Sequence, residues 1–265
     1  MHNTKIAFFD IDGTLTSFNT HTVPQSTIRA LQALQNNNIL ISICTGRGPS
    51  QVKPVLDLIP IEFDVIVSAN GQYCYNQKEI IHKQALDVKD VEHIVQWLDE
   101  HPQIRANFCE ENYTYLNHIT EQVRKEYAGL GKTAGELYED NPHTRIKNHE
   151  TLQISPFVNP AEEQELLQYC HNVQAVRWVD SFADILPPNG GKHAGIQAVL
   201  NYYGFTKDQA IAFGDGGNDM TMLDYVGTGV AMGNANPILF EHADFVTKSV
   251  DEDGIEYALK TLHII

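Results

Sequence analysis

The sequence is poor in cysteine and has no long hydrophobic run, and both absences exclude classes of protein. Its 265 residues contain four cysteines, which are widely spaced and form no C-x-x-C pair. A disulfide framework or a zinc site is therefore not expected, and the thiols should be reduced, as in a cytoplasm. No apolar stretch approaches the ~20 residues that cross a membrane, and the apolar run at 6–9 is too short for a signal peptide. We expect a cytoplasmic protein with no membrane partner.

Positive charge is also scarce. Lys and Arg number 18 against 34 Asp and Glu, which gives a formal net charge of −16 and a pI of about 5.0. A surface this acidic repels nucleic acid and anionic membranes, so neither is an expected partner. An anionic substrate would need a local group of positive charges in its binding site. The oligomeric state is left open by these totals.

At both ends of the chain, short apolar runs are separated by segments whose apolar residues recur at helical spacing. Such runs occur at 6–9, 38–47 and 64–71, and again at 209–219 after a helical segment at 192–203. Unbroken apolar runs separated by helices are typical of a parallel sheet that is covered on both faces. We therefore predict an α/β fold with a Rossmann-like parallel sheet at its core.

The middle of the chain differs from both ends. Its strand candidates alternate in polarity or carry aromatic residues, and amphipathic helices accompany them near 90–100 and 161–170. This pattern favours an antiparallel sheet with helices on one face. We predict two domains: a core formed by residues 1–81 and 188–265, and an inserted α+β domain formed by residues 82–187.

Two carboxylates, Asp10 and Asp12, end the first apolar run in the stretch FFDIDGTL. Side chains alternate along a strand, so we expect these two on the same side. Like charges this close repel each other, so one carboxylate should take up a proton or both should hold a cation. A solvated acidic turn is the alternative. Ligands bind beyond the carboxyl ends of strands in open α/β sheets, which makes both residues candidates for a site.

Three further polar segments are placed in the same way. The Thr-Gly-Arg segment at 45–47 offers a hydroxyl, a main-chain N–H and a cation, which suit a phosphate, although a helix N-cap is equally compatible. The stretch FGDGGND sets Asp215 and Asp219 around a glycine-rich turn that resembles a cation site, without the spacing of an EF-hand. Lys192 follows two glycines at a helix start, where a lysine is ordinarily just solvated but could also serve a phosphate.

The order of these motifs, DxDGT, TGR, a lysine and GDGGND, resembles the haloacid dehalogenase superfamily of phosphohydrolases. The spacing of the last two motifs and the tail VAMGNANPILFEHADFVTKSVDEDG are similar to its Cof-type subfamily in particular. That subfamily carries a large α/β cap before the lysine segment, which matches the place and size of residues 82–187. The resemblance implies a Mg²⁺-dependent phosphatase that acts on a small phosphorylated metabolite, with substrate choice in the cap.

The resemblance also implies a role for each motif residue. Asp10 would be the nucleophile that forms an aspartyl phosphate, and Asp12 would be the general acid and then the base. Mg²⁺ would be held by the Asp10 carboxylate, the Asp12 main-chain carbonyl and Asp215, with Asp219 as a further ligand or as support. The role of Arg47 is left open. The groups expected around the phosphoryl oxygens are the main-chain N–H of Ile11 and of Gly46, Thr45, Lys192 and Asn218.

Two other functions are compatible with these motifs. A phosphomutase could use the same residues on a sugar phosphate, and a non-catalytic phosphate-binding module could keep only the pocket. The presence of both Asp10 and Asp12 argues against the binding module. Asp12 also argues against a dehalogenase, because a departing halide needs no proton whereas an alcohol does.

Overall fold

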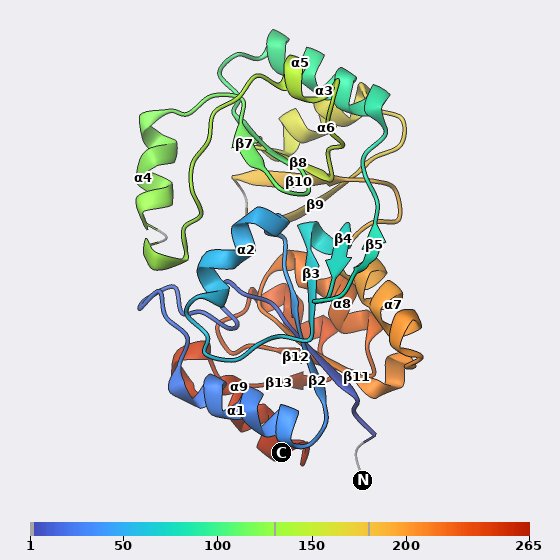
Figure 1. Ribbon diagram of the computed structural model, residues 1–265. Coiled ribbons are helices and arrows are strands. Elements are labelled where there is room, and N and C mark those ends of the chain that lie inside the picture. The colour runs from blue at the N-terminus through green and yellow to red at the C-terminus, as the bar shows by residue number, and fades with distance from the viewer. Residues whose placement is uncertain (1–2, 130, 180) are drawn as a thin grey trace.

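The structure, a computed structural model, describes residues 3–129, 131–179 and 181–265. Two lobes are stacked, and each is built on its own sheet (Figure 1). We call the lobe with the eight-stranded sheet the core lobe and the lobe with the five-stranded sheet the cap lobe. The predicted fold class, a parallel α/β core with an inserted α+β unit, is confirmed.

The core sheet has the strand order β13-β12-β11-β1-β2-β3-β4-β5. Neighbouring strands from β13 to β3 are parallel, whereas β4 and β5 are antiparallel additions at one edge. The chain builds this sheet from β1 to β5 in one direction, and after the cap lobe from β11 to β13 in the other. The strands are β1 (Ile6–Phe9), β2 (Leu40–Cys44), β3 (Val65–Ser68), β4 (Tyr73–Tyr75), β5 (Ile80–Lys83), β11 (Ala210–Gly214), β12 (Thr228–Ala231) and β13 (Phe245–Val246).

Helices cover both faces of the core sheet. Ala7 and Phe9 of β1 pack into one apolar cluster and Ile6 and Phe8 into the other, so the strand is buried on both sides. This double burial explains why the strands appear in the sequence as unbroken apolar runs. The first face is covered by α1 (Gln25–Asn36), α2 (Pro49–Leu56) and α9 (Gly254–Thr261), and the second by α7 (Lys192–Tyr203) and α8 (Met220–Tyr225).

The cap sheet is antiparallel and has the order β7-β6-β8-β10-β9. Phe108, Ile154 and Ile185 lie on its apolar face, which packs against helices on the side away from the core lobe (Figure 1). The other face is more polar and is turned towards the core lobe. The strands are β6 (Ala106–Cys109), β7 (Thr114–Leu116), β8 (Gln153–Pro156), β9 (Gln174–Val179) and β10 (Phe182–Leu186), and the helices are α3 (Val88–Glu100), α4 (Glu121–Gly129), α5 (Pro142–Arg145) and α6 (Pro160–Gln168).

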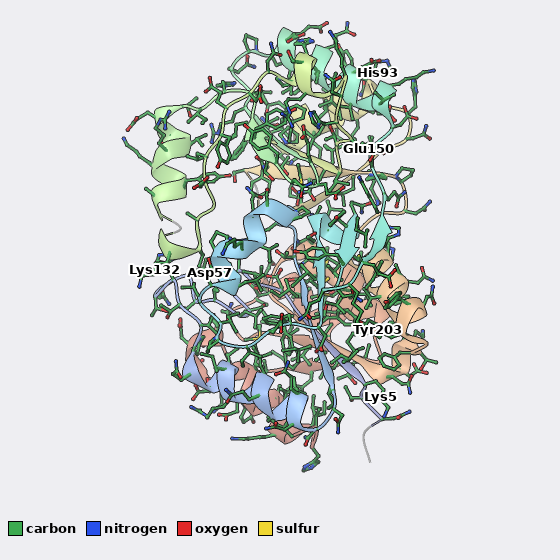
Figure 2. The ribbon with its side chains drawn as sticks, in the orientation of Figure 1. Lys5, Asp57, His93, Lys132, Glu150 and Tyr203 are labelled. Atoms are coloured by element: carbon green, nitrogen blue, oxygen red, sulfur yellow. The ribbon has the colours of Figure 1, made fainter. Side chains whose placement is uncertain are left out.

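The chain passes from the core lobe into the cap lobe after β5. The predicted boundary after residue 81 stays a prediction: β5 crosses it, because pairing with β4 keeps Lys83 in the core sheet, while Leu86 packs in the cap lobe. Side chains of both lobes project into the space between the two sheets (Figure 2). Short 3-10 helices complete the chain: η1 (Ala69–Gly71), η2 (Gly131–Thr133), η3 (Lys207–Gln209), η4 (Gly217–Asp219), η5 (Pro237–His242) and η6 (Val250–Glu252).

Two further features concern the cysteines and the helices. All four cysteines are free, and Cys44 is buried within β2. Within the described ranges, none of the helices combines the length and the apolar character that a membrane crossing requires.

Candidate active site

The carboxyl ends of the parallel strands meet at one edge of the core sheet, under the cap lobe. Asp10 follows β1, Thr45 follows β2, Asn70 lies two residues after β3, and Asp215 follows β11. β1 is the strand from which the sheet is built in both directions. In open α/β sheets, ligands bind beyond the carboxyl ends of the strands, at the place where the strand order reverses.

Three acids predicted from the motifs form a buried cluster with a lysine. Carboxylate oxygens of Asp10, Asp215 and Asp219 all lie within 4.8 Å of one another. Nζ of Lys192 donates to Oδ1 of Asp10 at 2.6 Å and to Oδ1 of Asp219 at 2.5 Å. Oδ2 of Asp219 accepts the main-chain N–H groups of Asp215 and Gly216. Both oxygens of Asp219 therefore accept protein hydrogen bonds, and this residue fixes the lysine and the turn.

Lys192 remains charged although its side chain is fully buried. Burial opposes the charge, but the carboxylates of Asp10 and Asp219 outweigh it and raise the pKa of Lys192 above its ordinary value. The ammonium group sits at the first residue of α7, where the helix dipole is positive and disfavours a cation. The two carboxylates offset that effect, and the lysine in turn reduces their repulsion.

Lys192 alone nevertheless does not neutralise the three acids of the cluster. Burial, opposed by the attraction of Lys192, raises the pKa of Asp10 to about 7. Burial, together with the charges of the neighbouring acids, raises the pKa of Asp215 to about 9, although the Thr14 hydroxyl donates to its Oδ1 at 2.8 Å. Crowded carboxylates of this kind are stabilised either by protons or by a cation.

The cluster fits a divalent cation that prefers oxygen ligands. Asp10 and Asp215 each place a carboxylate oxygen in the cluster. Oxygen atoms are the ligands that Mg²⁺ prefers. Space for Asp215 depends on Gly13: a Cβ at this position would lie 2.2 Å from Oδ2 of Asp215. The φ of Gly13 is +89°, a conformation that also favours glycine. The glycine of the DxDGT motif thus makes room for an acid from a distant segment.

Asp12 lies outside the cluster and pairs with Arg47. Oδ2 and Oδ1 of Asp12 accept hydrogen bonds from Nε and Nη2 of Arg47 at 2.8 and 2.7 Å. Nη1 of the same guanidinium donates to the main-chain carbonyl of Thr133, in the cap lobe, at 2.5 Å. The structure thereby gives Arg47, whose role the sequence left open, a position between the predicted acid-base residue and the cap.

A cavity of about 400 Å³ lies between these strand ends and the cap sheet. Lys192 and Asp219 are fully buried beneath it. In the described part of the chain, the main-chain N–H groups of Ile11 and Gly46 donate to no other residue, so both are available to an anion. Five of the predicted residues line the cavity: Asp10, Asp12, Thr45, Gly46 and Asn218.

The cap sheet forms the roof of the cavity. Asn107, Ser155 and Asp184 lie next to one another on β6, β8 and β10, and all three line the cavity. Phe157 and Phe182 continue this face, with ring centroids 5.6 Å apart. Burial raises the pKa of Asp184 to about 6, against the effect of the Ser155 hydroxyl, which donates to Oδ1 at 2.6 Å. The roof combines hydrogen-bonding groups with aromatic surface.

Asn70 is a residue of this region that the sequence analysis missed. The residue is 1% exposed, and its side chain is hydrogen-bonded to Asn218 in the core lobe and to Gln153 and Asp184 in the cap lobe. The available signal was the Asn-Gly pair directly after an apolar run, which is typical of a tight turn. The pair predicts the turn but not partners that lie far away in the sequence.

Comparisons with known proteins agree with one another. The family model for haloacid dehalogenase-like hydrolases matches residues 7–259. Over 268 residues the chain is 35% identical to "Putative phosphatase YkrA" of Bacillus subtilis (strain 168), with 99% of each chain covered. A solved subclass IIB sugar phosphatase of this superfamily is 35% identical, with a TM-score of 0.89, over 99% of this chain and 100% of that one. A solved phosphatase from Bacteroides thetaiotaomicron is 32% identical, with a TM-score of 0.87, over 100% of this chain and 97% of that one.

Proposed function

Because the chain belongs to the haloacid dehalogenase-like hydrolases and is a phosphatase of that family, we propose that it hydrolyses a small phosphorylated metabolite with Mg²⁺ through an aspartyl phosphate. One observation carries the proposal: Asp10 lines the cavity while buried Lys192 holds its Oδ1 at 2.6 Å. The free thiols favour the cytoplasm as its location.

In the proposed reaction, Asp10 attacks phosphorus and Asp12 moves the protons. A bond forms between the Asp10 carboxylate and phosphorus, and the ester bond to the leaving oxygen breaks. Asp12 gives that oxygen its proton. In the second half, Asp12 takes a proton from the water that attacks phosphorus, and Asp10 and inorganic phosphate are released. Lys192 lowers the pKa of Asp10 and fixes its Oδ1 for the attack.

Asp10 and Asp215 would hold the Mg²⁺ ion, together with the main-chain carbonyl of Asp12. We assign Asp219 to support, because both of its oxygens already accept hydrogen bonds from the protein. When bound, the ion neutralises negative charge on the phosphoryl group. The groups proposed to surround the phosphoryl oxygens are the N–H of Ile11, the N–H of Gly46, Thr45, Lys192 and Asn218.

The roof of the cavity favours a substrate that carries hydroxyl groups. Asn107, Ser155 and Asp184 offer amide, hydroxyl and carboxylate groups to the leaving group, and Phe157 and Phe182 offer flat apolar surface. A sugar phosphate or a similar polyhydroxy monoester has both kinds of surface. A second phosphate group would meet the carboxylate of Asp184, so monophosphates should be preferred over bisphosphates.

The proposed function is tested with a panel of phosphorylated metabolites in the presence of Mg²⁺. We expect release of inorganic phosphate from sugar monophosphates, together with the free sugar. Conversion of the substrate to an isomeric phosphate without free phosphate would instead establish a phosphomutase. Binding of phosphate without turnover of any monoester, p-nitrophenyl phosphate included, would establish a binding module.

Replacement of Asp12 by Asn should slow alkyl esters much more than aryl esters. Asn keeps one of the two acceptor oxygens that face Arg47 but has no acidic proton to give. Alkoxide leaving groups need that proton far more than p-nitrophenolate does. We expect kcat to fall by about 10²- to 10⁴-fold on a sugar phosphate and clearly less on p-nitrophenyl phosphate. Steady-state kinetics on both substrates measure the difference. Equal losses on the two esters would contradict the proton-donor role.

Binding of Mg²⁺ should release protons and should strengthen as pH rises. In the metal-free protein the pKa of Asp10 is about 7 and that of Asp215 about 9, so at pH 6 the ion displaces protons from both. We expect the Kd for Mg²⁺ to fall at least about tenfold between pH 6 and pH 8, since each displaced proton contributes up to tenfold per pH unit. Calorimetry in two buffers of different ionisation enthalpy measures the released protons. A pH-independent Kd, or full activity in EDTA, would contradict the metal assignment.

A further inference from the structure

The loop after β3 has an unusual backbone beside the cavity. Ala69, Asn70 and Gly71 have φ values of 49°, 51° and 91°. Asparagine and glycine tolerate this left-handed region, whereas alanine is disfavoured in it. A backbone that is held in such a conformation next to a site suggests a function for the side chain that it presents.

The same loop is fixed against two segments of the candidate active site. The N–H of Ala69 donates to the carbonyl of Arg47 at 2.8 Å, and the N–H of Asn70 donates to the carbonyl of Thr45 at 3.0 Å. On the other side Gly71 approaches the segment before Lys192 so closely that a Cβ would lie 2.4 Å from the carbonyl oxygen of Gly191. The position of Asn70 is therefore determined by the surrounding core lobe.

The side-chain amide of Asn70 joins the two lobes. Its Oδ1 accepts a hydrogen bond from Nδ2 of Asn218, in the core lobe, at 3.1 Å. Its Nδ2 donates to Oδ2 of Asp184 at 2.8 Å and to Oε1 of Gln153 at 3.0 Å, both in the cap lobe. A second link runs beside it, from Nε2 of Gln153 to the carbonyl of Gly46 at 3.2 Å. Both ends of the amide are thus occupied, one by each lobe.

The two cap-lobe partners fix the orientation of this amide. Asp184 and Gln153 present acceptors, so the NH₂ group of Asn70 must face the cap lobe and its oxygen must face Asn218. A reversed amide would place its NH₂ group against the NH₂ group of Asn218, with no acceptor between them. Without the cap lobe in place, only the single hydrogen bond from Asn218 favours this orientation.

We propose that Asn70 is a positioning residue that couples closure of the cap lobe to binding of the phosphoryl group. Closure brings Asp184 and Gln153 onto the amide, and the oriented amide then holds Asn218 in the position from which it binds phosphate. The inference rests on the proposed function, in which Asn218 contacts the phosphoryl oxygens. It predicts that a change at Asn70 weakens phosphate binding even though Asn70 itself does not line the cavity.

Asn70→Gly removes the amide and keeps the backbone, because glycine adopts a positive φ without strain. Inorganic phosphate is the probe, since it is too small to need the roof, and its Kd is measured by calorimetry with Mg²⁺ present. We expect the Kd to rise about tenfold, the energy of one to two hydrogen bonds, at a temperature at which circular dichroism shows that the variant is folded. Asn38→Gly is the matched control, because Asn38 is exposed and has a φ of 57°. Phosphate binding by Asn70→Gly that equals the control would overturn the proposal.

Exchanging the amide and the carboxylate between positions 70 and 184 distinguishes coupling between the lobes from a simple loss of packing. Asn70→Asp places a carboxylate against Asp184, so it should bind phosphate more weakly than Asn70→Gly does. The double variant Asn70→Asp with Asp184→Asn restores a carboxylate–amide pair with the roles exchanged, and its Kd should return to within about threefold of the wild type. If the Asp variant is no worse than the Gly variant, or the double variant does not recover, the coupling is wrong. If the wild-type protein neither binds phosphate nor cleaves any ester, the proposed function itself fails.

Discussion

Asp10→Asn is expected to abolish turnover while leaving the fold intact. The amide of asparagine is not a nucleophile for phosphorus, so kcat should fall by at least about 10⁴-fold, in line with losses measured for other catalytic nucleophiles. Release of inorganic phosphate measures the loss. Intact-mass analysis of the same sample excludes hydrolysis of the new amide back to aspartate.

In the absence of metal, the same variant should not show the loss of stability that Asp10 causes as pH rises from about 4 to about 7. Burial raises the pKa of Asp10 to about 7, which means that its ionised form is less favourable in the folded protein than in the unfolded chain. The native state therefore binds more protons than the unfolded one between about pH 4 and pH 7, and stability falls as pH rises through that window. Removing the charge removes this penalty, while Lys192 keeps Asp219 as its partner.

Asp57→Asn is the matched control for this experiment. Asp57 lies on the surface (Figure 2), with 62% of its side chain exposed, and pairs with Lys53. Its replacement should leave both kcat and the melting temperature close to wild-type values. Turnover by Asp10→Asn within tenfold of this control would exclude Asp10 as the nucleophile.

The position of the site was predictable because of the parallel sheet. Once the apolar runs are assigned to parallel strands, their carboxyl ends must meet, and polar residues that follow them must share an edge. Asp10 and Asp215 follow neighbouring strands, β1 and β11, which explains how residues so far apart in sequence reach one cluster. The roof of the cavity was harder to predict, because Asn107, Ser155 and Asp184 meet only through the register of the cap sheet.

The pairing of Asp12 with Arg47 could not be predicted from the alternation of side chains along a strand. The alternation of side chains along a continuous strand predicts Asp10 and Asp12 on one side and in mutual repulsion. Both residues line the cavity, and the charge of Asp12 contributes to the raised pKa of Asp10. Strand β1 nevertheless ends at Phe9, and the carbonyl of Ile11 accepts N–H groups from the turn that follows. The two carboxylates consequently have different partners, Lys192 for Asp10 and Arg47 for Asp12. No local pattern could supply that result, because both partners come from distant segments.

Lys192→Met is expected to lower both stability and activity, more than any exposed lysine variant does. Methionine fills much of the same space but leaves Asp10 and Asp219 without their buried cation. Removing one partner of a buried ion pair typically costs roughly 3 to 5 kcal/mol, so the melting temperature of the metal-free protein should fall markedly. Loss of a preorganised cation at the phosphoryl group should lower kcat by about 10²- to 10³-fold.

The pH dependence and a control identify the cause of that loss. Without Lys192 the carboxylates can be neutralised only by protons or by metal, so the destabilisation should be largest at alkaline pH and should shrink as pH falls or as Mg²⁺ is added. Lys53→Met is the control, because 75% of the Lys53 side chain is exposed. A loss of stability in Lys192→Met that is the same at every pH would point to packing rather than charge. In that case the balance of charges at Asp10, on which the proposed nucleophile depends, would have to be explained without the lysine.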